Sequence, residues 1–568
     1  MRKLTRPTRK INTVRKPLGI TTINQMLEMS AEMHGDRTAY LHPRNKFIIK
    51  ISFNQVLERV KRLARQLKDL GLGFGDNIAL IGDNGPEWGI SYFSVTWIGA
   101  TVIPLDARAP VDSHRFVLRF SSAKAIIVDA SHLSDIKSIE HELIDLKHII
   151  LMESFDEIFN KYHKGIESES ISEDQILQIL FTSGTTGNPK GVMLTHKNVM
   201  SNVEDMYSII ELSPEDRAFS ILPVHHSYEC TCGLIGPFYN GTGVFYARSL
   251  RPREMLEDLK TASPTIWLNT PLILEKLYLR LTKELANQRG IRSIFAKTLP
   301  KRLIGKKIKN NLGLENIKYI VCGGAALPNW VSTGLEELGF PILQGYGLSE
   351  TSPLVSVNPP SNPKNRSVGM IIKSNEVEIF DVDSEGNGEI VVKGPNVMKG
   401  YYKNEIATKE VFTPEGWFLT GDLGYFDDEG YLYITGRKKS LIVTKGGKNV
   451  FPEEIEEKLT KSRFIEEALV YSPDDKNIHA LIYPNIDEVI STLGSQGFES
   501  SEDSIWNLLK TEIRTINQDL EAHKKINNFA IRLEEFPKTT TRKIKRYLFK
   551  NISLEPEQKV IKVIRDHN

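Results

Sequence analysis

The feature of this sequence that most constrains its fold is a glycine- and threonine-rich turn within ILFTSGTTGNPKGVML, residues 179–194. The run that precedes the turn, residues 176–181, is mostly apolar, which predicts a buried strand. Glycines let backbone N–H groups approach a ligand closely, and hydroxyls add further donors. With the positive charge of Lys190, these donors suit phosphate oxygens. The sequence therefore predicts a phosphate-binding loop at the end of a strand, formed by Thr182, Ser183, Gly184, Thr185, Thr186, Gly187 and Lys190.

The order of the residues excludes a Walker-type loop. That pattern needs a glycine, four residues and then Gly-Lys-Ser/Thr. Here Pro189 stands five residues after Gly184, and Lys190 is followed by Gly191. Kinases and GTPases of the P-loop type are therefore disfavoured. A surface loop rich in Gly and Thr is the alternative that composition alone permits.

The length of the chain, 568 residues, exceeds what one compact core supports, so we expect at least two domains. Its 40% hydrophobic and 25% charged residues are ordinary for a globular protein, and the net charge of +2 gives no indication of a nucleic-acid partner. No apolar run reaches the length of a membrane-spanning helix. Three cysteines do not form a disulfide framework and fit a reducing cytoplasm.

The first sixteen residues carry several Arg and Lys residues but no acid, and no apolar core follows them. This pattern is not that of a secretory signal. We interpret residues 1–20 as a basic N-terminal arm that is solvated and partly disordered. A weak peripheral attraction to the anionic inner face of a membrane is the alternative.

Short apolar segments alternate with amphipathic ones from residue 77 onward, which predicts α/β layers with parallel sheets. The expected strands are residues 78–81, 125–128, 176–181, 266–268 and 317–321, and the expected helices are 53–70, 198–210 and 271–285. Short strands separated by Gly and Asp turns follow from residue 367, at 376–380, 389–392 and 431–434. They predict a β-rich subdomain. Later helices near 452–461 and 504–519 predict a small α+β unit.

Five strings follow the phosphate loop along the chain. They are GGAALP at 323–328, GYGLSET at 345–351, GWFLTGDLGYFDDEGYLYITGR at 416–437, KKSLIVTKGGKNVFPEEIE at 438–456 and FPKTTTRKIKRYLF at 536–549. Together with the phosphate loop they resemble the adenylate-forming family, which includes acyl-CoA synthetases, beetle luciferases and peptide-synthetase adenylation domains. The resemblance implies a large AMP-binding domain, here residues 21–437, and a small mobile α+β C-terminal domain, residues 438–568.

The resemblance also implies where the nucleobase binds. The first glycine-rich turn would pack against adenine, and the aromatic ring of the second turn would stack on the base. These residues are Gly323, Gly324 and Ala325 in the first turn and Gly345, Tyr346 and Gly347 in the second.

Four further residues match the family's contacts to phosphate, metal and ribose. Ser349 stands where the family usually has Thr, and it keeps the hydroxyl donor. Glu350 matches the glutamate that holds Mg²⁺ near the phosphates. Asp422 would accept hydrogen bonds from both ribose hydroxyls, and Arg437 would reach the same ribose.

The small domain carries the remaining implied functions. Lys439 occupies the place of the family's pivot for a domain rotation, and Gly446 with Gly447 would line a tunnel for a pantetheine arm. Lys543 aligns with the family's catalytic lysine, although Arg542 replaces the usual Gly before it. In the large domain, His226 matches a position beside the bound acid and phosphate. The resemblance thus implies Lys543, Glu350, His226 and Lys190 as the catalytic set.

The implied reaction is ATP-dependent activation of an acid to an acyl-adenylate with release of pyrophosphate, followed by transfer to CoA with release of AMP. Residues 292–313 and the ending TTTRKIKR resemble bacterial long-chain acyl-CoA synthetases. We therefore expect a long-chain fatty acid, ATP and CoA as substrates, with Mg²⁺ as the metal.

Three alternatives stay open. In the first, the acyl group is transferred to the phosphopantetheine of an acyl carrier protein. The basic clusters at 301–309 and 538–550 would contact such an acidic partner. A luciferase-like oxidoreductase adds O₂ chemistry after adenylation. A non-catalytic nucleotide-binding protein is the third, against which the intact catalytic and ribose-binding positions argue. Oligomeric state is left open by the sequence.

Overall fold

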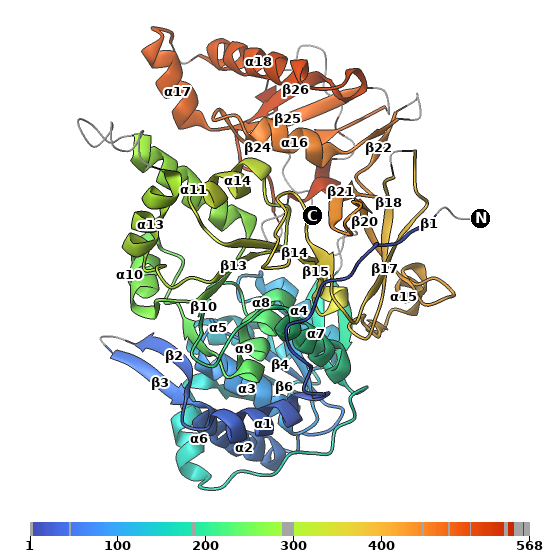
Figure 1. Cartoon of the computed structure of the whole chain (residues 1–568). Coiled ribbons are helices and arrows are strands. Elements are labelled where there is room, and N and C mark those ends of the chain that lie inside the picture. Colours follow the sequence, from blue (N-terminus) through green and yellow to red (C-terminus); the bar gives the residue numbers. More distant parts are fainter. Residues whose placement is uncertain are drawn as a thin grey trace.

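The structure, a computed structural model, describes residues 4–44, 47–182, 189–286, 300–384, 386–444, 448–474, 477–499, 501–538, 544–549, 552 and 560–561. A large N-terminal body, blue to yellow in Figure 1, carries a smaller C-terminal body in orange and red. The mixed α/β architecture with a large and a small domain is the fold class that the sequence predicts.

The phosphate hairpin belongs to a seven-stranded sheet with the order β19-β9-β8-β5-β4-β6-β7. Its strands are β4 (Asn77–Ile81), β5 (Thr101–Pro104), β6 (Ala125–Val128), β7 (His148–Leu151), β8 (Ile176–Thr182), β9 (Lys190–Thr195) and β19 (Gly400–Tyr401). The pairs from β8 through β5, β4 and β6 to β7 are parallel, whereas β9 runs antiparallel to both β8 and β19. The expected strand at 125–128 is confirmed, and its four side chains are buried because helices cover both faces of a parallel sheet.

A nine-stranded sheet has the order β16-β15-β14-β13-β12-β10-β11-β2-β3. Its strands are β2 (Thr38–Arg44), β3 (Phe47–Ser52), β10 (Arg217–Ser220), β11 (Gly243–Tyr246), β12 (Ile266–Asn269), β13 (Tyr319–Cys322), β14 (Ile342–Gly347), β15 (Leu354–Val357) and β16 (Met370–Ile371). The central strands from β14 to β2 are parallel. The turn at Gly323–Ala325 therefore follows β13, whereas Gly345–Gly347, expected as a turn, form the end of the neighbouring parallel strand β14.

Helices cover these sheets. They are α1 (Ile23–His34), α2 (Phe53–Asp69), α3 (Pro86–Trp97), α4 (Val111–Ser121), α5 (Ala130–Ile139), α6 (Phe155–Lys161), α7 (His196–Ile209), α8 (Ser227–Glu229), α9 (Gly236–Asn240), α10 (Pro252–Ala262), α11 (Pro271–Ala286), α13 (Lys301–Leu312) and α14 (Asn329–Glu337). Nearly every side chain of α3 is buried, and α3 contacts β2, β4 and β5. It therefore lies in the core between the two sheets.

The predicted β-rich subdomain is an antiparallel sheet with the order β1-β17-β18-β20-β21. Its elements are β1 (Leu4–Thr5), β17 (Glu376–Phe380), β18 (Gly388–Lys393), β20 (Phe418–Phe426) and β21 (Leu432–Arg437), with α15 (Glu405–Glu410) beside them.

The N-terminal segment is bound to the large body, so the expectation of a partly disordered arm is wrong for residues 4–15, although most of these residues are exposed. Arg6 pairs with the nearly buried carboxylate of Glu378 at 2.6 Å. Ile11 is buried and donates its N–H to Ile371, and the N–H groups of Val14 and Arg15 both donate to the carbonyl of Ser208. In Figure 1 the dark-blue segment runs from β1 beside β17 down the front of the large body. Apolar and hydrogen-bonding partners far along the chain overcome the repulsion among its charges.

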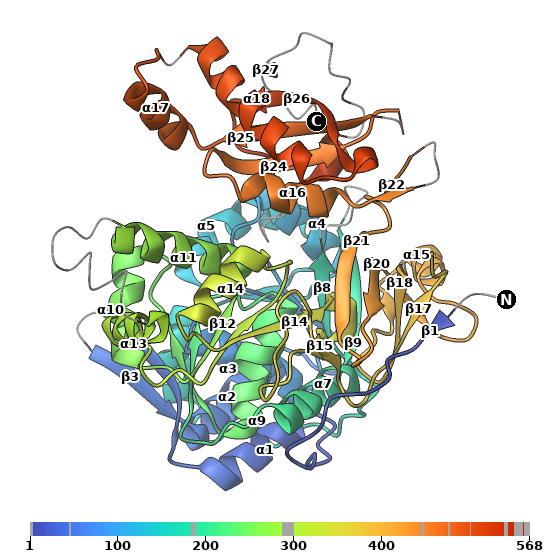
Figure 2. The ribbon, with the colours of Figure 1, turned by 45° about the horizontal axis from the view of Figure 1, so that its top comes forward.

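The small body has its own core. Its sheet pairs β24 (Ile465–Tyr471), β25 (Ile478–Pro484), β26 (Ile526–Arg532) and β27 (Val560–Ile561) in that order. A hairpin of β22 (Ile442–Val443) and β23 (Asn449–Val450) and the helices α16 (Pro452–Thr460), α17 (Ile486–Ser495) and α18 (Glu502–Gln518) complete it. The helix α16 lies on the side that faces the large body (Figure 2). Within the described part of the chain, no helix is long and apolar enough to cross a membrane.

Candidate active site

The phosphate hairpin is formed by β8 and β9, in which Thr182 and Lys190 are direct partners on opposite strands. The register brings both residues to the loop end of the hairpin. The loop residues between them that the sequence singles out, Ser183 to Gly187, lie outside the described residues. Lys190 places its ammonium group 4.9 Å from the ring centroid of Tyr401.

Tyr401 links the phosphate hairpin to Glu350. It lies in β19, which pairs with β9. Its hydroxyl donates to Oε1 of Glu350 at 2.9 Å, and burial together with this carboxylate raises the pKa of Tyr401. Glu350 lies in a short 3₁₀ turn, Ser349–Thr351, where its carbonyl accepts from the N–H of Met398 at 2.8 Å. Glu350 therefore lies in the same cluster as Lys190.

A single carboxylate at this place fits Mg²⁺. Magnesium is usually bound through one or two carboxylates and substrate phosphates, with water completing the octahedron. In the described ranges, no group of three or more His, Cys, Asp and Glu side chains is arranged to hold a metal. Glu350 would thus supply the protein ligand, and phosphate oxygens at the hairpin would supply others.

The two residues expected at the ribose face each other across β20 and β21. Asp422 and Arg437 are register partners, and Nε of Arg437 lies 2.8 Å from Oδ1 of Asp422. The hydroxyl of Tyr346 donates to Oδ2 at 2.7 Å, and burial together with Asp422 raises the pKa of Tyr346. These two contacts fix the orientation of the Asp422 carboxylate, a group that accepts hydrogen bonds from hydroxyls.

The two glycine-rich turns lie next to each other because β13 and β14 are parallel neighbours, with Cys322 opposite Gln344. Gly324 has a φ of +86°, a conformation that favours glycine. A Cβ on Gly323 would lie 3.4 Å from the ring of Tyr228, so this turn is closely packed. At Gly347 a Cβ would lie 1.9 Å from the carbonyl oxygen of Pro353. Glycine is therefore required at 347, because the backbone before β15 comes too close for any side chain.

The loop after β10 brings His226 to the same region. Ser227 Oγ lies 3.3 Å from the hydroxyl of Ser349, the residue before Glu350. His226 accepts the N–H of Tyr228 at the start of α8 through Nδ1. The structure thus brings His226, Ser349 and Glu350 into one neighbourhood.

A buried acid that the sequence analysis did not single out supports this loop. Glu229 is 1% exposed and accepts from Ser220 Oγ at 2.5 Å. Burial raises its pKa to about 8. Asn84 donates to the same hydroxyl at 3.2 Å and accepts the N–H of Val224 at 3.1 Å. Glu229 is therefore part of the network that holds the loop carrying His226. The only feature of the sequence that could have indicated Glu229 is its position three residues after His226.

Lys439 lies in the turn that follows β21, where the N–H groups of Ser440 and Leu441 donate to the carbonyl of Arg437 at 2.9 and 3.0 Å. Its side chain is exposed. Just after it, the core of the small body begins at Ile442. The turn therefore connects the ribose-side strand to the small body.

Hydrogen bonds join the two bodies at α16 and at β23. The carboxylate of Glu457 accepts the N–H of Asn329 at the start of α14 at 3.0 Å. Asn449 donates to Asp383 at 3.1 Å. The tunnel residues Gly446 and Gly447 and the catalytic candidate Lys543 lie outside the described residues.

Comparison with known proteins identifies the class. Residues 27–402 match the AMP-binding enzyme family, and residues 439–558 match the AMP-binding enzyme C-terminal domain. The chain therefore belongs to the AMP-binding enzyme family. It is an adenylate-forming acyl ligase, so the family prediction is confirmed.

Two of the similar proteins are long-chain acyl ligases. One is the chloroplastic long-chain-fatty-acid–[acyl-carrier-protein] ligase of Arabidopsis thaliana, 28% identical over 85% of this chain and 78% of the relative. The other is long-chain-fatty-acid–CoA ligase 6 of Rattus norvegicus, 30% identical over 74% of this chain and 67% of the relative. These two relatives differ in the acceptor that their names give.

Solved structures show the same fold. O-succinylbenzoate coenzyme A synthetase from Bacillus subtilis in complex with AMP has a TM-score of 0.74 and 25% identity, and the match covers 94% of this chain and 98% of that one. The same synthetase with ATP and magnesium ion has a TM-score of 0.72 and 24% identity, over 92% and 98%.

Proposed function

We propose that this enzyme activates a long-chain fatty acid with ATP and transfers the acyl group to CoA. The observation that carries the proposal is the cluster in which Tyr401 contacts both Lys190 and Glu350. This cluster brings together the ammonium group of Lys190, the carboxylate proposed to bind the metal, and the phosphate hairpin. Such a set suits a polyphosphate that must be neutralised before an anion can attack it.

The first half-reaction joins two anions. A carboxylate oxygen of the acid forms a bond to the α-phosphorus, the bond from that phosphorus to the bridging oxygen breaks, and pyrophosphate leaves. Repulsion between two unit charges about 4 Å apart costs roughly 4 kcal/mol at an intermediate dielectric. Lys190 and Lys543 would offset this repulsion, and Mg²⁺ held by Glu350 would add to their effect. Positioning and charge stabilisation suffice for such a transfer.

The nucleoside end is held by the ribose pair. Asp422 would accept from the ribose hydroxyls, while Arg437 and Tyr346 fix the orientation of its carboxylate. The turns at Gly323–Ala325 and Gly345–Gly347 would receive the adenine. Because the nucleoside and the phosphates are held at two separate places, the α-phosphate would be positioned for attack by the carboxylate of the acid.

In the second half-reaction the thiol of CoA attacks the acyl carbonyl. The new carbon–sulfur bond replaces the carbon–oxygen bond to AMP, AMP leaves, and the thiol proton passes to solvent. We infer that the small domain, residues 438–568, rotates about Lys439 between the two steps, with the strand of Gly446 and Gly447 guiding the pantetheine arm. Closure over the site keeps water from the reactive anhydride.

We infer a cytoplasmic location because the three cysteines, Cys230, Cys232 and Cys322, are all free. The acid is proposed from the names of the sequence relatives, and the structural likeness to a succinylbenzoate ligase gives the competing substrate class.

A panel of saturated acids of increasing chain length and O-succinylbenzoate, scored by pyrophosphate release with CoA present, tests the proposal. The highest kcat/KM is expected with a long-chain acid. A maximum with O-succinylbenzoate or a short acid would contradict the substrate assignment while leaving the adenylation chemistry intact.

An acyl carrier protein is the second candidate acceptor. The name of the Arabidopsis thaliana relative, an acyl-carrier-protein ligase, favours it. Replacing CoA by holo-carrier protein in the same assay separates the two acceptors.

A further inference from the structure

A cavity of about 760 Å³ lies on the large domain at the opposite strand ends from the nucleotide turns. Its lining includes Tyr319 at the start of β13, Ile342 at the start of β14 and one face of α13. Five cationic side chains line it against two carboxylates, those of Glu315 and Glu336. The lining therefore carries more cationic than acidic side chains.

Three of these cations already have partners. The ammonium group of Lys309 donates to the carbonyl of Gly339 at 2.8 Å, and burial lowers the pKa of this lysine. Lys318 pairs with Asp216, and Lys364 pairs with two carboxylates of the loop after β20. These three charges are neutralised or engaged within the fold.

The other two cations, Arg302 and Lys306, are exposed and form no ion pair with any residue that the structure describes. They are one turn apart on α13 and both line the cavity, so they share one face of the helix. Lys307, the next residue, is exposed but lies outside the lining.

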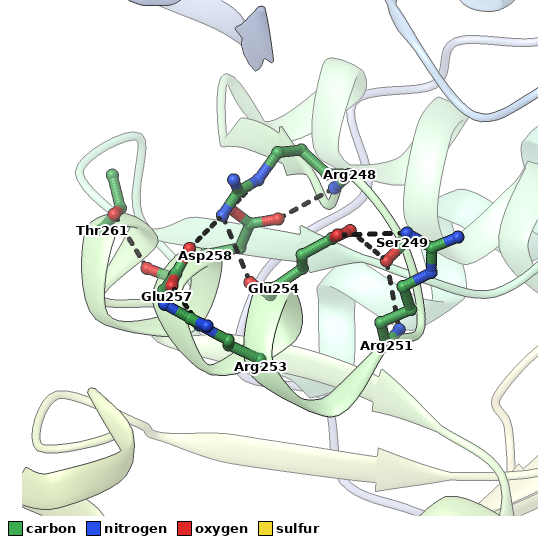
Figure 3. A network of polar contacts seen from close by, with 8 residues as sticks. All are labelled: Arg248, Ser249, Arg251, Arg253, Glu254, Glu257, Asp258 and Thr261. Carbon is green, nitrogen blue, oxygen red and sulfur yellow. Dashed lines mark hydrogen bonds and ion pairs between the residues drawn. The ribbon is translucent and has the colours of Figure 1, made fainter. Parts of the chain in front are cut away.

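The neighbouring helix α10 shows the contrasting arrangement. The arginines just before it and in its first turn are matched by acids of the helix, as the network in Figure 3 shows. Arg248 pairs with Asp258 and Glu257, and Arg251 pairs with Glu254. The arginines of this segment are thus paired, in contrast to Arg302 on α13.

The helix α13 is fixed firmly in place. A Cβ on Gly305 would lie 1.6 Å from the carbonyl oxygen of Leu338, so α13 packs directly against the end of α14. Lys301 adds an ion pair to Glu337 at 2.6 Å. The two unpaired cations therefore have a fixed spacing relative to α14.

The helix α14 also reaches the junction between the two domains, because the N–H of Asn329 donates to Glu457 of α16. Figure 1 shows α14 below the small body, with α13 beside it. A macromolecule bound at the cavity would thus lie at the other end of α14 from this junction.

We propose that the α13 cavity docks an acidic acyl carrier protein, whose pantetheine thiol then enters the junction and accepts the acyl group. This inference rests on the proposed adenylation of a fatty acid. Fixed cations in a concave cavity suit an acidic helix of a folded partner, since complementary charge steers encounter and sets orientation. A flat bilayer would meet the rim of the cavity before its lining.

The test compares Lys306→Glu with Lys307→Glu, two charge reversals one residue apart. With holo-carrier protein as acceptor at low salt, Lys306→Glu should raise the apparent KM about tenfold, and Arg302→Glu/Lys306→Glu should raise it further. Lys307→Glu should stay within about twofold of wild type, because Lys307 lies outside the lining of the cavity. Glu336→Gln removes a negative charge from the lining and should lower the KM.

The kinetic constants for CoA, measured in the same variants, show whether the effect is specific for the carrier protein. Unchanged CoA kinetics and a KM difference that fades at high salt support docking. Equal effects of Lys306→Glu and Lys307→Glu would overturn it. So would salt-sensitive binding of the wild type to anionic vesicles that Lys306→Glu abolishes without affecting carrier-protein turnover.

Two measurements keep this inference apart from the proposed function. Pyrophosphate release with fatty acid and CoA reports on adenylation alone, and its absence for every acid rejects the proposed function. Anisotropy of labelled holo-carrier protein reports on docking alone. If wild type does not bind the carrier protein, docking is rejected even where CoA turnover is normal.

Discussion

The Asp422 carboxylate is held from two sides, by Arg437 on the paired strand and by the hydroxyl of Tyr346. This arrangement fixes the orientation of the carboxylate before any ligand arrives. Removing a charged hydrogen-bond partner costs about 1.5–3 kcal/mol.

Asp422→Ala should therefore raise the KM for ATP by about 10- to 100-fold and abolish discrimination against deoxy-ATP. Tyr346→Phe keeps the ring and removes only one orienting bond, so its effect should be smaller. Steady-state kinetics with both nucleotides measures this. Discrimination unchanged in Asp422→Ala would reject the ribose assignment.

Glu350 offers a similarly direct test of the metal assignment. Glu350→Gln removes one negative charge at nearly constant shape, and adenylation should fall by about 10²- to 10³-fold. Tyr401→Phe, which leaves the carboxylate intact, serves as the control and should retain most activity. Pyrophosphate release at several Mg²⁺ concentrations is the readout. Activity within a few-fold of wild type in Glu350→Gln would mean that another group holds the metal.

Glu229 gives a dependence of stability on pH. Burial raises its pKa from 4.5 to about 8, so the folded state binds the proton more tightly than the unfolded chain. The stability from the protonated carboxyl is complete below pH 4.5 and is lost as pH rises through about 8. Relative to Glu229→Gln, which stays neutral, the Tm of the wild type should fall between about pH 5 and pH 9. Parallel Tm curves for the two proteins would contradict the shift.

At the residue scale the sequence supplied Lys190, Glu350, Asp422 and Arg437 but not Tyr401. The first four lie in ordered strings that carry a recognisable pattern. Tyr401 reaches Glu350 only because the two-residue strand β19 pairs with β9. Such a long-range pairing leaves no local periodicity.

Among the elements, apolar strands flanked by polar turns were predictable, as for β6 and β17, whose bounds match the expectation. The helix α3 was not predicted. It is buried on nearly all sides, so its sequence lacks the alternation of polar and apolar residues by which a surface helix is recognised. The order of strands in the two large sheets was also beyond the sequence, since periodicity does not encode which strands are neighbours.

The connection between β21 and the small domain suggests a crossed experiment. Lys543→Ala should block acyl-adenylate formation but still convert supplied acyl-adenylate to thioester. Gly446→Leu should do the reverse, because a side chain would narrow the tunnel. Lys439→Pro restricts φ at the proposed pivot and should slow the half-reaction that needs the less accessible orientation.

The readout is each half-reaction assayed separately in all three variants. Equal loss of both half-reactions in Lys543→Ala and Gly446→Leu would exclude rotation between two states and indicate one fixed site.

Across the whole molecule, the N-terminal segment ties the β-rich subdomain to the N-terminal half of the large domain. Removing residues 1–16 deletes the Arg6–Glu378 pair, the burial of Ile11 and the bonds to Ser208. The Tm should fall by at least about 3 °C. Removal of residues 1–3 alone is the matched control and should leave the Tm unchanged. Equal Tm values for the two truncations would show that these contacts contribute no stability.

The partners of that segment lie far along the chain. Arg6 and Glu378 are separated by 372 positions, and Thr8 donates to the carbonyl of Asp428 across 420 positions. During synthesis, the ribosome therefore makes the segment long before its partners exist. Since domains generally fold as they emerge, strands of the seven- and nine-stranded sheets can pair while β1 is still unpaired. Its final closure, and with it full resistance of the N-terminus to proteases, comes only after the β-rich subdomain has left the exit tunnel.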